Sequence, residues 1–384
     1  MPVRRIAINT GGGDAPGLNA VIRAATLAAI ERDWEVWGIK QGYRGLIEDD
    51  DAPWSAMQGH AGLVRLDRDA VRGIGHLGGT ILGTVNRGDP FHYPTRVAGQ
   101  DKLEPVDRSR DVVERFASLG FDGLIAIGGD GSMRIASKLH DAGLPLIIGV
   151  PKTIDNDVLG TDVTFGFDTA VSIATDAIDR LHTTTEAHER VMVVEVMGRN
   201  AGWIALTAGL AGGADAILIP EIPYRIESIA GKIAQRERRG RHFSIVVAAE
   251  GAMPVGGAVT TRGDGDVFRG VAILGGVAEH LAAELGPLTG KETRSMVLGH
   301  LQRGGSPSSA DRVLAQRFAA AAIRRFADER GSGMIGLQRD VMELVPFELC
   351  AGGTRTVPVD RGAVITARAL GISLGDEDPA CFLR

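Results

Sequence analysis

Short apolar runs alternate along the chain with segments in which apolar residues recur every three or four positions. The runs RIAIN, GLIAI, LPLIIGV, VMVVEV, AILIP and SIVVAAEG predict buried strands. The intervening segments, for example residues 18–29 and 168–181, predict amphipathic helices. Strands that are apolar at every position are typical of parallel sheets with helices on both faces. The pattern therefore predicts an α/β protein with doubly wound, mainly parallel sheets of the Rossmann-like kind.

The length of the chain favours two such domains. It has 384 residues, and single hydrophobic cores stop growing at about 250–300 residues. In doubly wound folds, ligands bind at the carboxyl ends of the strands. The 53 glycines cluster just after apolar runs, where glycine lets the backbone come close to a ligand or to another segment. The strand ends are therefore the expected binding sites.

Charge and composition narrow the class of protein. A formal net charge of −6 argues against a general binder of nucleic acid. The N-terminus has no apolar segment suited to a signal peptide. The longest uncharged run, residues 200–214, is shorter than the roughly 20 residues that span a bilayer. Cys350 and Cys381 have no metal-ligand spacing and imply no disulfide framework. We expect a soluble cytoplasmic protein with no membrane or nucleic-acid partner.

Two glycine-rich stretches at strand ends have the pattern of anion sites. TGGGDAPG, residues 10–17, opens a predicted helix, where free backbone N–H groups and the helix dipole attract phosphate. GGDGS, residues 128–132, repeats the arrangement and adds Asp130. A carboxylate beside bound phosphate requires a cation between them, which makes Asp130 a candidate Mg²⁺ ligand. The alternatives are a tight turn without a ligand and a helix-capping aspartate, and GGDG also occurs in lipid kinases and NAD kinases.

The stretch PKTIDND, residues 151–157, offers acid–base chemistry after a buried strand. Asp155 and Asp157 are two residues apart on an extended loop, so their side chains point the same way. One carboxylate could orient its neighbour or hold a metal while the other accepts a proton from a hydroxyl group. Thr153 and Asn156 add uncharged hydrogen-bonding groups. The alternative is a network of Asx turns that closes the loop.

Cations follow two further predicted strands. MGRNAG places Arg199 where its guanidinium could stabilise the oxygens of a transferring phosphoryl group. VLGHLQRGGSP places His300 and Arg303 three residues apart, as a possible clamp for a phosphate monoester. The alternatives are a surface arginine and a histidine that is satisfied within the fold. Together with the glycine-rich stretches, these residues predict a phosphoryl-transfer site.

Two familiar nucleotide motifs are excluded. No GxxxxGK[ST] sequence occurs, so the site is not built on a Walker loop. GIGHLG, residues 73–78, matches a dinucleotide-binding fingerprint, but it follows the polar stretch LDRDAVR rather than a strand. A nicotinamide-dependent oxidoreductase is therefore not expected.

The order of the motifs resembles that of the phosphofructokinases. The segments that carry the resemblance are TGGGDAPGLNAVIR, GGTILGT, IAIGGDGS, GVPKTIDND, TFGFDTA, VVEVMGRNAGW, IPE and VLGHLQRGG. They span nearly the whole chain and look most like the branch with both ATP-using and pyrophosphate-using members. The resemblance implies an enzyme that transfers a phosphoryl group to the 1-hydroxyl of fructose 6-phosphate, with Mg²⁺ and ATP.

The resemblance also implies roles for individual residues. Asp155 resembles the general base that takes the proton of the sugar hydroxyl, with Thr153 beside it and Arg199 as a further catalytic group. The residues implied to hold the phosphoryl donor are Gly13, Arg87, Gly129, Asp130, Gly131, Ser132 and Lys152, with Asp130 as the Mg²⁺ ligand. Those implied to hold fructose 6-phosphate are Thr153, Asp155, Arg190, Met197, Gly198, Arg199, Glu221, Arg294, His300 and Arg303.

In this family Arg190 and Arg294 match arginines that reach in from a neighbouring subunit, so a homotetramer or homodimer with shared sites is implied. The family's two domains are discontinuous in sequence. The implied donor domain comprises residues 1–165 and 302–352, and the implied sugar-phosphate domain comprises residues 166–301 and 353–384.

Three departures from the short bacterial members matter. GTVNR places Asn86 where those enzymes have an arginine, and Arg87 follows it. Arg23 of their effector site is kept, but Leu27 and His182 fill two other positions, which puts regulation by ADP or phosphoenolpyruvate in question. PKT replaces PGT, so a lysine enters the substrate loop.

The identity of residue 152, a lysine, bears on which phosphoryl donor the enzyme uses. Lys152 is typical of pyrophosphate users, whereas Gly131 is typical of ATP users, and we expect ATP. The alternatives are a pyrophosphate-dependent enzyme and a non-catalytic, ligand-sensing paralogue.

Overall fold

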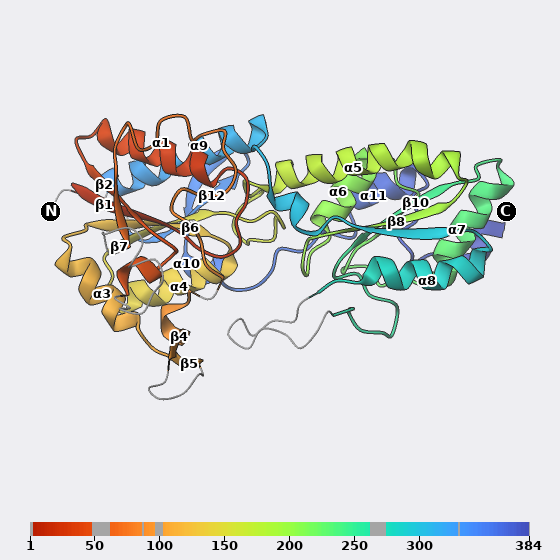
Figure 1. Ribbon diagram of the computed structural model, residues 1–384, viewed down its shortest axis with the longest axis horizontal. Helices are drawn as coiled ribbons and strands as arrows, with labels where there is room; N and C mark the ends of the chain where they lie inside the picture. The colour runs from red at the N-terminus through yellow and green to blue at the C-terminus, as the bar shows by residue number, and fades with distance from the viewer. Residues whose placement is uncertain are drawn as a thin grey trace. The chain divides into compact units, whose positions relative to one another are not determined.

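The computed structural model describes residues 3–47, 62–86, 88–96, 103–261, 274–328 and 331–383. They form two compact units, each of the α/β class (Figure 1). Unit 1 comprises Met1–Thr153, Val158–Gly166 and Arg303–Gly353, and unit 2 comprises Ile154–Asp157, Phe167–Gln302 and Thr354–Arg384. The implied domain boundaries after residues 165, 301 and 352 each differ from these by one residue. The larger difference is the segment Ile154–Asp157, which belongs to unit 2 and not to the first domain.

Unit 1 contains a seven-stranded sheet in the order β13-β12-β7-β6-β1-β2-β3. The central pairs are parallel, and β13 and β3 pair antiparallel at the two edges. A separate antiparallel pair is formed by β4 and β5. The strands are β1 (Arg5–Thr10), β2 (Glu35–Ile39), β3 (Leu63–Leu66), β4 (Tyr93–Arg96), β5 (Leu103–Val106), β6 (Gly123–Gly128), β7 (Leu146–Pro151), β12 (Gly333–Gln338) and β13 (Val341–Val345).

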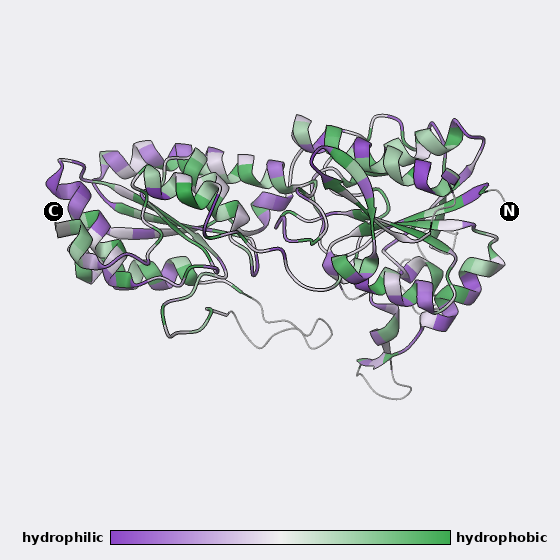
Figure 2. Ribbon diagram, turned by 180° about the vertical axis from the view of Figure 1, so that it is seen from behind, coloured by the Kyte–Doolittle hydropathy of each residue, from purple (hydrophilic) through white to green (hydrophobic). Residues whose placement is uncertain are grey.

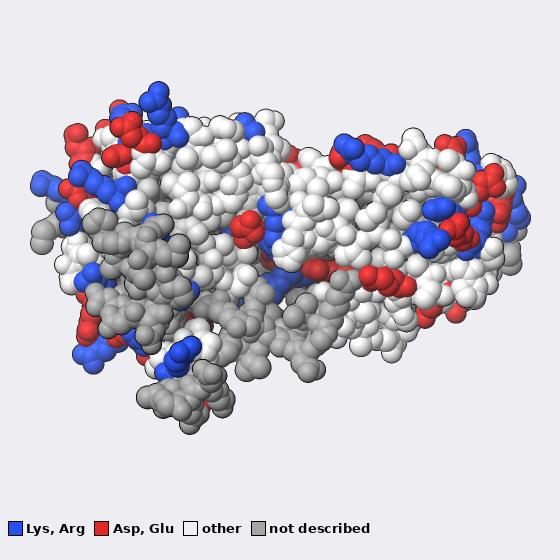
Figure 3. Space-filling view, viewed as in Figure 1, with Lys and Arg blue, Asp and Glu red and all other residues white. Residues whose placement is uncertain are grey.

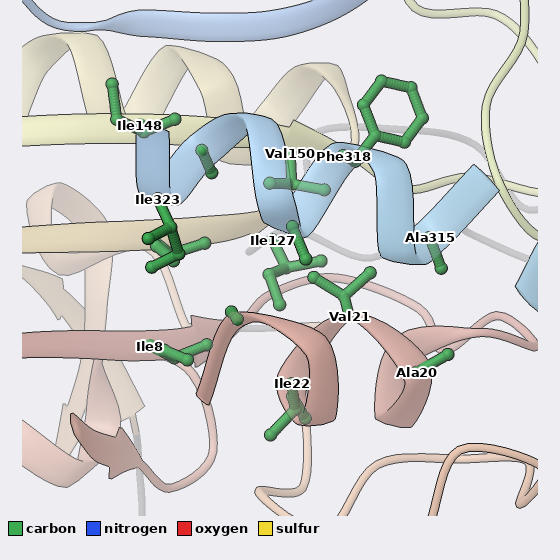
Figure 4. Close-up of a cluster of buried hydrophobic side chains, with 14 of the residues drawn as sticks. Ile8, Ala20, Val21, Ile22, Ile127, Ile148, Val150, Ala315, Phe318 and Ile323 are labelled. Carbon is green, nitrogen blue, oxygen red and sulfur yellow. The ribbon is translucent and has the colours of Figure 1, made fainter. Parts of the chain in front are cut away.

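Helices cover both faces of this sheet (Figure 1). On one face α1 (Leu18–Ile30) and α9 (Ser309–Asp328) pack against β1, β6 and β7, and Figure 4 shows Val21, Ile127 and Phe318 within that core. The other face carries α3 (Ser109–Ser118), α4 (Asp130–Asp141) and α10 (Phe347–Cys350). Unit 1 also contains two short 3₁₀ helices, η1 (Arg44–Leu46) and η2 (Pro90–His92). A third, η3 (Gly299–Arg303), includes the point at which the chain passes from unit 2 to unit 1.

Unit 2 contains a four-stranded parallel sheet in the order β11-β8-β10-β9. Its core lies between the sheet and two helices, α7 (Ile226–Arg238) and α8 (Val277–Thr289). The opposite face carries α5 (Phe167–Ala187), α6 (Trp203–Ala211) and α11 (Ala363–Ala369), and η4 (Pro379–Leu383) packs on α7. The strands are β8 (Val191–Val196), β9 (Ala216–Leu218), β10 (Ser244–Ala249) and β11 (Thr293–Val297).

The predicted fold class is confirmed, and the strands show why the pattern was informative. Every residue of β6, β8 and β10 is buried, as expected for parallel strands between two helical layers. In Figure 2 the apolar colour follows these strands, and the polar colour gathers on the outward sides of the helices. Cys350 and Cys381 are both free thiols. Within the described ranges, none of the helices is both long and apolar enough to cross a membrane.

Candidate active site

The glycine-rich loops of unit 1 meet at one edge of its sheet. They follow β1, β6 and β7, which are adjacent parallel strands, so their carboxyl ends lie side by side. The N–H of Gly11 donates to the carbonyl of Ile127 at 2.9 Å, and the N–H of Lys152 donates to the carbonyl of Gly128 at 2.9 Å. Backbone hydrogen bonds therefore connect TGGG, GGDGS and PKT, as their positions in the sequence predict.

Ser132 shows why glycine is needed in two of these loops. Its Oγ would lie 2.9 Å from a Cβ added at Gly11 and 2.1 Å from one added at Gly128. Side chains at those two positions would push Ser132 away and separate the loops. Because α4 begins at Asp130, the first N–H groups of this helix lie in the GGDGS segment. The N-terminus of α4 is thus a structural basis for phosphate binding.

Asp130 lies at this helix start and forms an ion pair with Arg134 one turn later, with an Nη2–Oδ2 distance of 3.0 Å. About a third of its side chain is exposed. Among the residues that the structure describes, no cluster of three or more His, Cys, Asp or Glu side chains could hold a metal ion. A lone carboxylate at a phosphate site suits Mg²⁺, which usually takes one or two protein carboxylates plus phosphate oxygens and water. Asp130 fits this kind of ligand set.

Lys152 is buried, with 4% of its surface exposed, and its Nζ donates to the carbonyl oxygen of Gly13. Thr84 bonds the same loop through the carbonyls of Thr10 and Gly12, at 3.2 and 2.5 Å. The lysine therefore fixes the first glycine-rich loop as well as offering a positive charge. Arg87, predicted to contact the donor, lies outside the described residues.

The predicted clamp of His300 and Arg303 is divided by the unit boundary, which falls between Gln302 and Arg303. His300 is exposed in unit 2. Arg303 belongs to unit 1, where its Nη1 donates to the carbonyl of Asp14 at 2.8 Å and would lie 3.1 Å from a Cβ on Gly13. A side chain larger than glycine at position 13 would therefore displace this guanidinium.

In unit 2 the turn after β8 carries Met197, Gly198 and Arg199. Gly198 has a φ of +147°, and a Cβ there would lie 2.5 Å from the carbonyl oxygen of Ala201. Arg199 itself has a φ of +51°, in the left-handed region that few residues other than glycine adopt. Its N–H donates to Oε1 of Glu250 at 2.9 Å. Hydrogen bonding to Glu250 therefore stabilises a strained turn at a predicted site residue.

Glu250 is the site residue that the sequence analysis missed. It follows β10, and its N–H donates to the carbonyl of Val196 at 2.8 Å, so it lies beside the end of β8. The pKa of Glu250 is raised to about 7, mainly by burial and also by the charges of Asp155 and Glu195, while hydrogen bonds from the N–H groups of Arg199 and Gly198 act to lower it. Asp155, with 3% of its surface exposed, is close enough to act on this carboxyl. The signal in the sequence was the acid just before the final glycine of SIVVAAEG.

The raised pKa of Glu250 predicts a pH-dependent stability. A carboxyl whose pKa is about 7 in the folded protein and about 4.5 when unfolded binds its proton more tightly when folded. The free energy of unfolding therefore falls as pH rises from about 4.5 through about 7, by roughly 3 kcal/mol at about 1.4 kcal/mol per pKa unit. Glu250→Gln should remove this loss, so the variant's melting temperature relative to wild type should rise over that range. Melting curves that stay parallel would contradict the assignment.

Glu221 has a different set of partners. Both of its oxygens accept the N–H of Gly202 at 3.1 Å, and Oε1 also accepts the N–H of Val357 at 2.8 Å. Gly202 ends the turn that carries Arg199. The structure thus places Glu221, predicted to hold the sugar phosphate, where it braces that turn through backbone groups.

The two arginines implied to serve a neighbouring subunit lie together in unit 2. Arg294 on β11 contacts Glu292 through Nε at 2.8 Å and through Nη2 at 2.7 Å. Arg190 contacts the same carboxylate at 3.4 Å. The side chain of Arg294 is 63% exposed and that of Arg190 is 18% exposed. The two guanidinium groups thus meet at one carboxylate, the kind of anion that arginine binds in the same way as phosphate.

The surface carries charged side chains of both signs (Figure 3). On the face drawn in Figure 3, acidic and basic side chains of the described residues are interspersed on each unit.

A family model described as phosphofructokinase matches residues 5–326. The chain belongs to the phosphofructokinase family. The resemblance seen in the motifs is therefore confirmed, and the family's enzymes transfer a phosphoryl group to a hydroxyl acceptor.

Relatives with both kinds of donor are similar to this phosphofructokinase-family chain. An ATP-dependent 6-phosphofructokinase of Chloroflexus aurantiacus is 48% identical over 374 residues, which are 97% of this chain and 98% of the relative. A pyrophosphate–fructose 6-phosphate 1-phosphotransferase of Amycolatopsis methanolica is 46% identical over 359 residues, 93% and 97% of the two chains. The structure of Pichia pastoris phosphofructokinase in the T-state matches 92% of this chain and 36% of the yeast chain, with a TM-score of 0.75 and 29% identity.

Proposed function

We propose that the chain is a cytoplasmic ATP-dependent 6-phosphofructokinase of glycolysis. It transfers the γ-phosphoryl group of Mg-ATP to the 1-hydroxyl of fructose 6-phosphate and gives fructose 1,6-bisphosphate. The observation that carries this assignment is the buried Asp155, which acts electrostatically on Glu250 beside the Arg199 turn. It lies two residues after Thr153, the last residue of the donor-side loop in unit 1, so their Cα atoms are within about 7 Å.

Unit 1 supplies the residues for the donor. Backbone N–H groups of the loop at Gly13 and of the Gly129–Ser132 segment bind phosphate oxygens at the start of α4. Lys152 holds the first loop in shape and adds a positive charge beside it. Asp130 would hold Mg²⁺, which neutralises charge on the donor phosphates when it is bound. Arg134, which pairs with Asp130 here, would then have its guanidinium available for the donor.

Unit 2 supplies the residues for the acceptor. Asp155 takes the proton of the sugar 1-hydroxyl as that oxygen attacks phosphorus. Thr153, the last residue of unit 1 before this segment, hydrogen-bonds the reacting groups. Arg199 donates to the oxygens of the phosphoryl group during transfer. Met197 and Gly198 place the sugar against the Arg199 turn, and a protonated Glu250 can donate a hydrogen bond to a sugar hydroxyl without adding negative charge.

The 6-phosphate is bound by Arg190, Arg294, His300 and Arg303, of which the first two serve the site of a neighbouring subunit. The exposed Arg294 and the acid that it shares with Arg190 support this part of the proposal. The enzyme is accordingly a homo-oligomer, a dimer or a tetramer.

Two other functions were open from the sequence. The Amycolatopsis relative favours pyrophosphate as a second candidate donor, and Lys152 agrees with it. A non-catalytic paralogue would be expected to lack at least one of Asp130, Asp155 and Arg199, and this chain has all three. A coupled assay with fructose 6-phosphate, Mg²⁺ and either ATP or pyrophosphate tests all three functions. Absence of fructose 1,6-bisphosphate with both donors would overturn the proposal.

Shared sites predict complementation between inactive subunits. Asp155→Asn lacks the base of its own site, and Arg294→Ala lacks the arginine that it gives to its neighbour. When the two are mixed at equal amounts and reassembled, roughly a quarter of the sites should contain both intact residues. Each variant reassembled alone is the control. If mass measurements show that hybrid oligomers have formed and activity still stays at the level of the controls, the site is not shared.

A further inference from the structure

The segment Ile154–Asp157 belongs to unit 2, although the residues on both sides of it belong to unit 1. The preceding strand β7 ends at Pro151, and Val158–Gly166 is again part of unit 1. A short excursion of this kind needs anchoring by residues of unit 2. The anchoring matters because the segment begins one residue before Asp155, the proposed base.

Arg355 supplies two of these anchors. Its N–H donates to the carbonyl of Asp157 at 2.8 Å, and its Nη1 donates to the carbonyl of Asn156 at 2.9 Å. Asn156 has a φ of +54°, a left-handed conformation that asparagine tolerates better than most residues. The two carbonyl groups that follow Asp155 in the chain are thus both held by one residue, from the segment in which the chain returns to unit 2.

Trp203 fixes Arg355 in turn. The guanidinium carbon of Arg355 lies 4.2 Å from the centroid of the Trp203 ring, and the Trp203 Nε1–H donates to the Arg355 carbonyl at 2.9 Å. Trp203 is the first residue of α6 and immediately follows the MGRNAG turn. Two residues after Arg355, Val357 shares Glu221 with Gly202. The return segment is therefore bonded to the end of the Arg199 turn at two points.

We propose that Arg355 is a positioning residue, which fixes the segment carrying Asp155 to the turn carrying Arg199 and so keeps the base and the phosphoryl-binding arginine at a constant spacing. The proposal rests on the roles given to those two residues under the proposed function. An arginine suits the task because its planar guanidinium can stack on an indole and donate in its own plane at the same time. A lysine ammonium cannot reproduce both contacts.

Because Arg355 is proposed to act through the position of Asp155, replacing Arg355 should affect kcat more than KM. Misplacement by about 1 Å can cost roughly 10²-fold in rate, so Arg355→Met should lower kcat by roughly 10- to 10²-fold, and KM for fructose 6-phosphate should change less than kcat. Arg355→Lys should recover only part of the loss. Trp203→Phe keeps the ring but removes the bond to the Arg355 carbonyl, and should show a smaller loss of the same kind. Arg180→Met, on the exposed side of α5, is the matched control.

A double-mutant cycle separates positioning from simple stabilisation. If Arg355 acts through Asp155, Arg355→Met in the Asp155→Asn background should lower kcat by less than threefold. Independent effects would multiply. Hydrogen–deuterium exchange gives a readout without catalysis, since amides of residues 154–157 should exchange faster in Arg355→Met than in wild type while β8 and β10 stay protected.

The wild-type assay keeps the two proposals distinct. An inactive wild type would overturn the proposed function, whereas the exchange measurement would still report whether Arg355 holds the segment. With an active wild type, multiplicative losses in the cycle, or unchanged exchange at residues 154–157, would overturn the positioning role. A kcat of Arg355→Met equal to that of Arg180→Met would overturn it as well.

Discussion

Asp155→Asn is expected to lower kcat by roughly 10²–10⁴-fold, the usual contribution of general acid–base catalysis. Asparagine keeps the size of the side chain and most of its hydrogen bonding, but it cannot take the proton of the 1-hydroxyl. KM for fructose 6-phosphate should change little, because the phosphate of the substrate is bound by other residues. Steady-state kinetics with saturating ATP measure both constants.

The matched control is Asp176→Asn, which removes a negative charge from the exposed side of α5 in the same unit. It should leave both constants within a factor of about two, as expected for a surface substitution. A near-normal kcat for Asp155→Asn would remove Asp155 from the role of base. A large rise in KM with an unchanged kcat would make it a binding residue instead.

The sequence was sufficient to predict the sheets because their strands are apolar throughout. β6, β8 and β10 have no exposed residue, and no other common architecture buries both faces of so many short strands. The position of the chain crossing at residues 154–157 was not predictable in the same way. It depends on Arg355, which lies some 200 residues later, and on the stacking of Arg355 against Trp203. No local pattern shows a contact of that range.

The same distinction applies to the candidate site, where residues within a local sequence pattern were predicted and Glu250, which has no such pattern, was not. The loops after β1, β6 and β7 were found because glycines and charges after buried strands are visible in the sequence. Glu250 was passed over, although it also follows a buried strand, because one acid before a glycine has no motif of its own. Only the bonds to Arg199 and Val196 and the raised pKa show its importance.

The structure changes the physical reasoning about Lys152. A lysine on a flexible stem could in principle swing aside for either donor. The side chain is instead buried and bonded to the Gly13 carbonyl, so it shapes the loop whether or not a donor is bound. Lys152→Met, which keeps the buried stem, is therefore a better test than Lys152→Gly, which would also leave a cavity.

Gly131 is the position that is expected to determine whether ATP or pyrophosphate is used as the donor. A Cβ at residue 131 would have Nη2 of Arg134 as its nearest neighbour outside the local helix backbone, at 3.9 Å, so the added carbon itself makes no clash. An aspartate there would place a negative charge near the α-phosphate of ATP. Two unit charges ~4 Å apart at an effective dielectric constant of ~20 repel by about 4 kcal/mol, before relief by Mg²⁺ and Arg134. Pyrophosphate has no α-phosphate or ribose at that point.

Gly131→Asp should therefore lower kcat/KM for ATP by roughly 10²–10³-fold, the lower end allowing for partial neutralisation of the new charge by Arg134. Gly131→Ala adds bulk without charge and should keep ATP use within a factor of about three, since the nearest atom outside the local helix backbone, Nη2 of Arg134, lies 3.9 Å from the added Cβ. Lys152→Met should keep ATP as the preferred donor, with a loss below about tenfold. Steady-state kinetics with both donors on the wild type and the three variants measure these effects.

Equal losses in Gly131→Ala and Gly131→Asp would show that bulk rather than charge excludes ATP. A wild type with a higher kcat/KM for pyrophosphate than for ATP would overturn the donor assignment and leave the phosphofructokinase reaction in place.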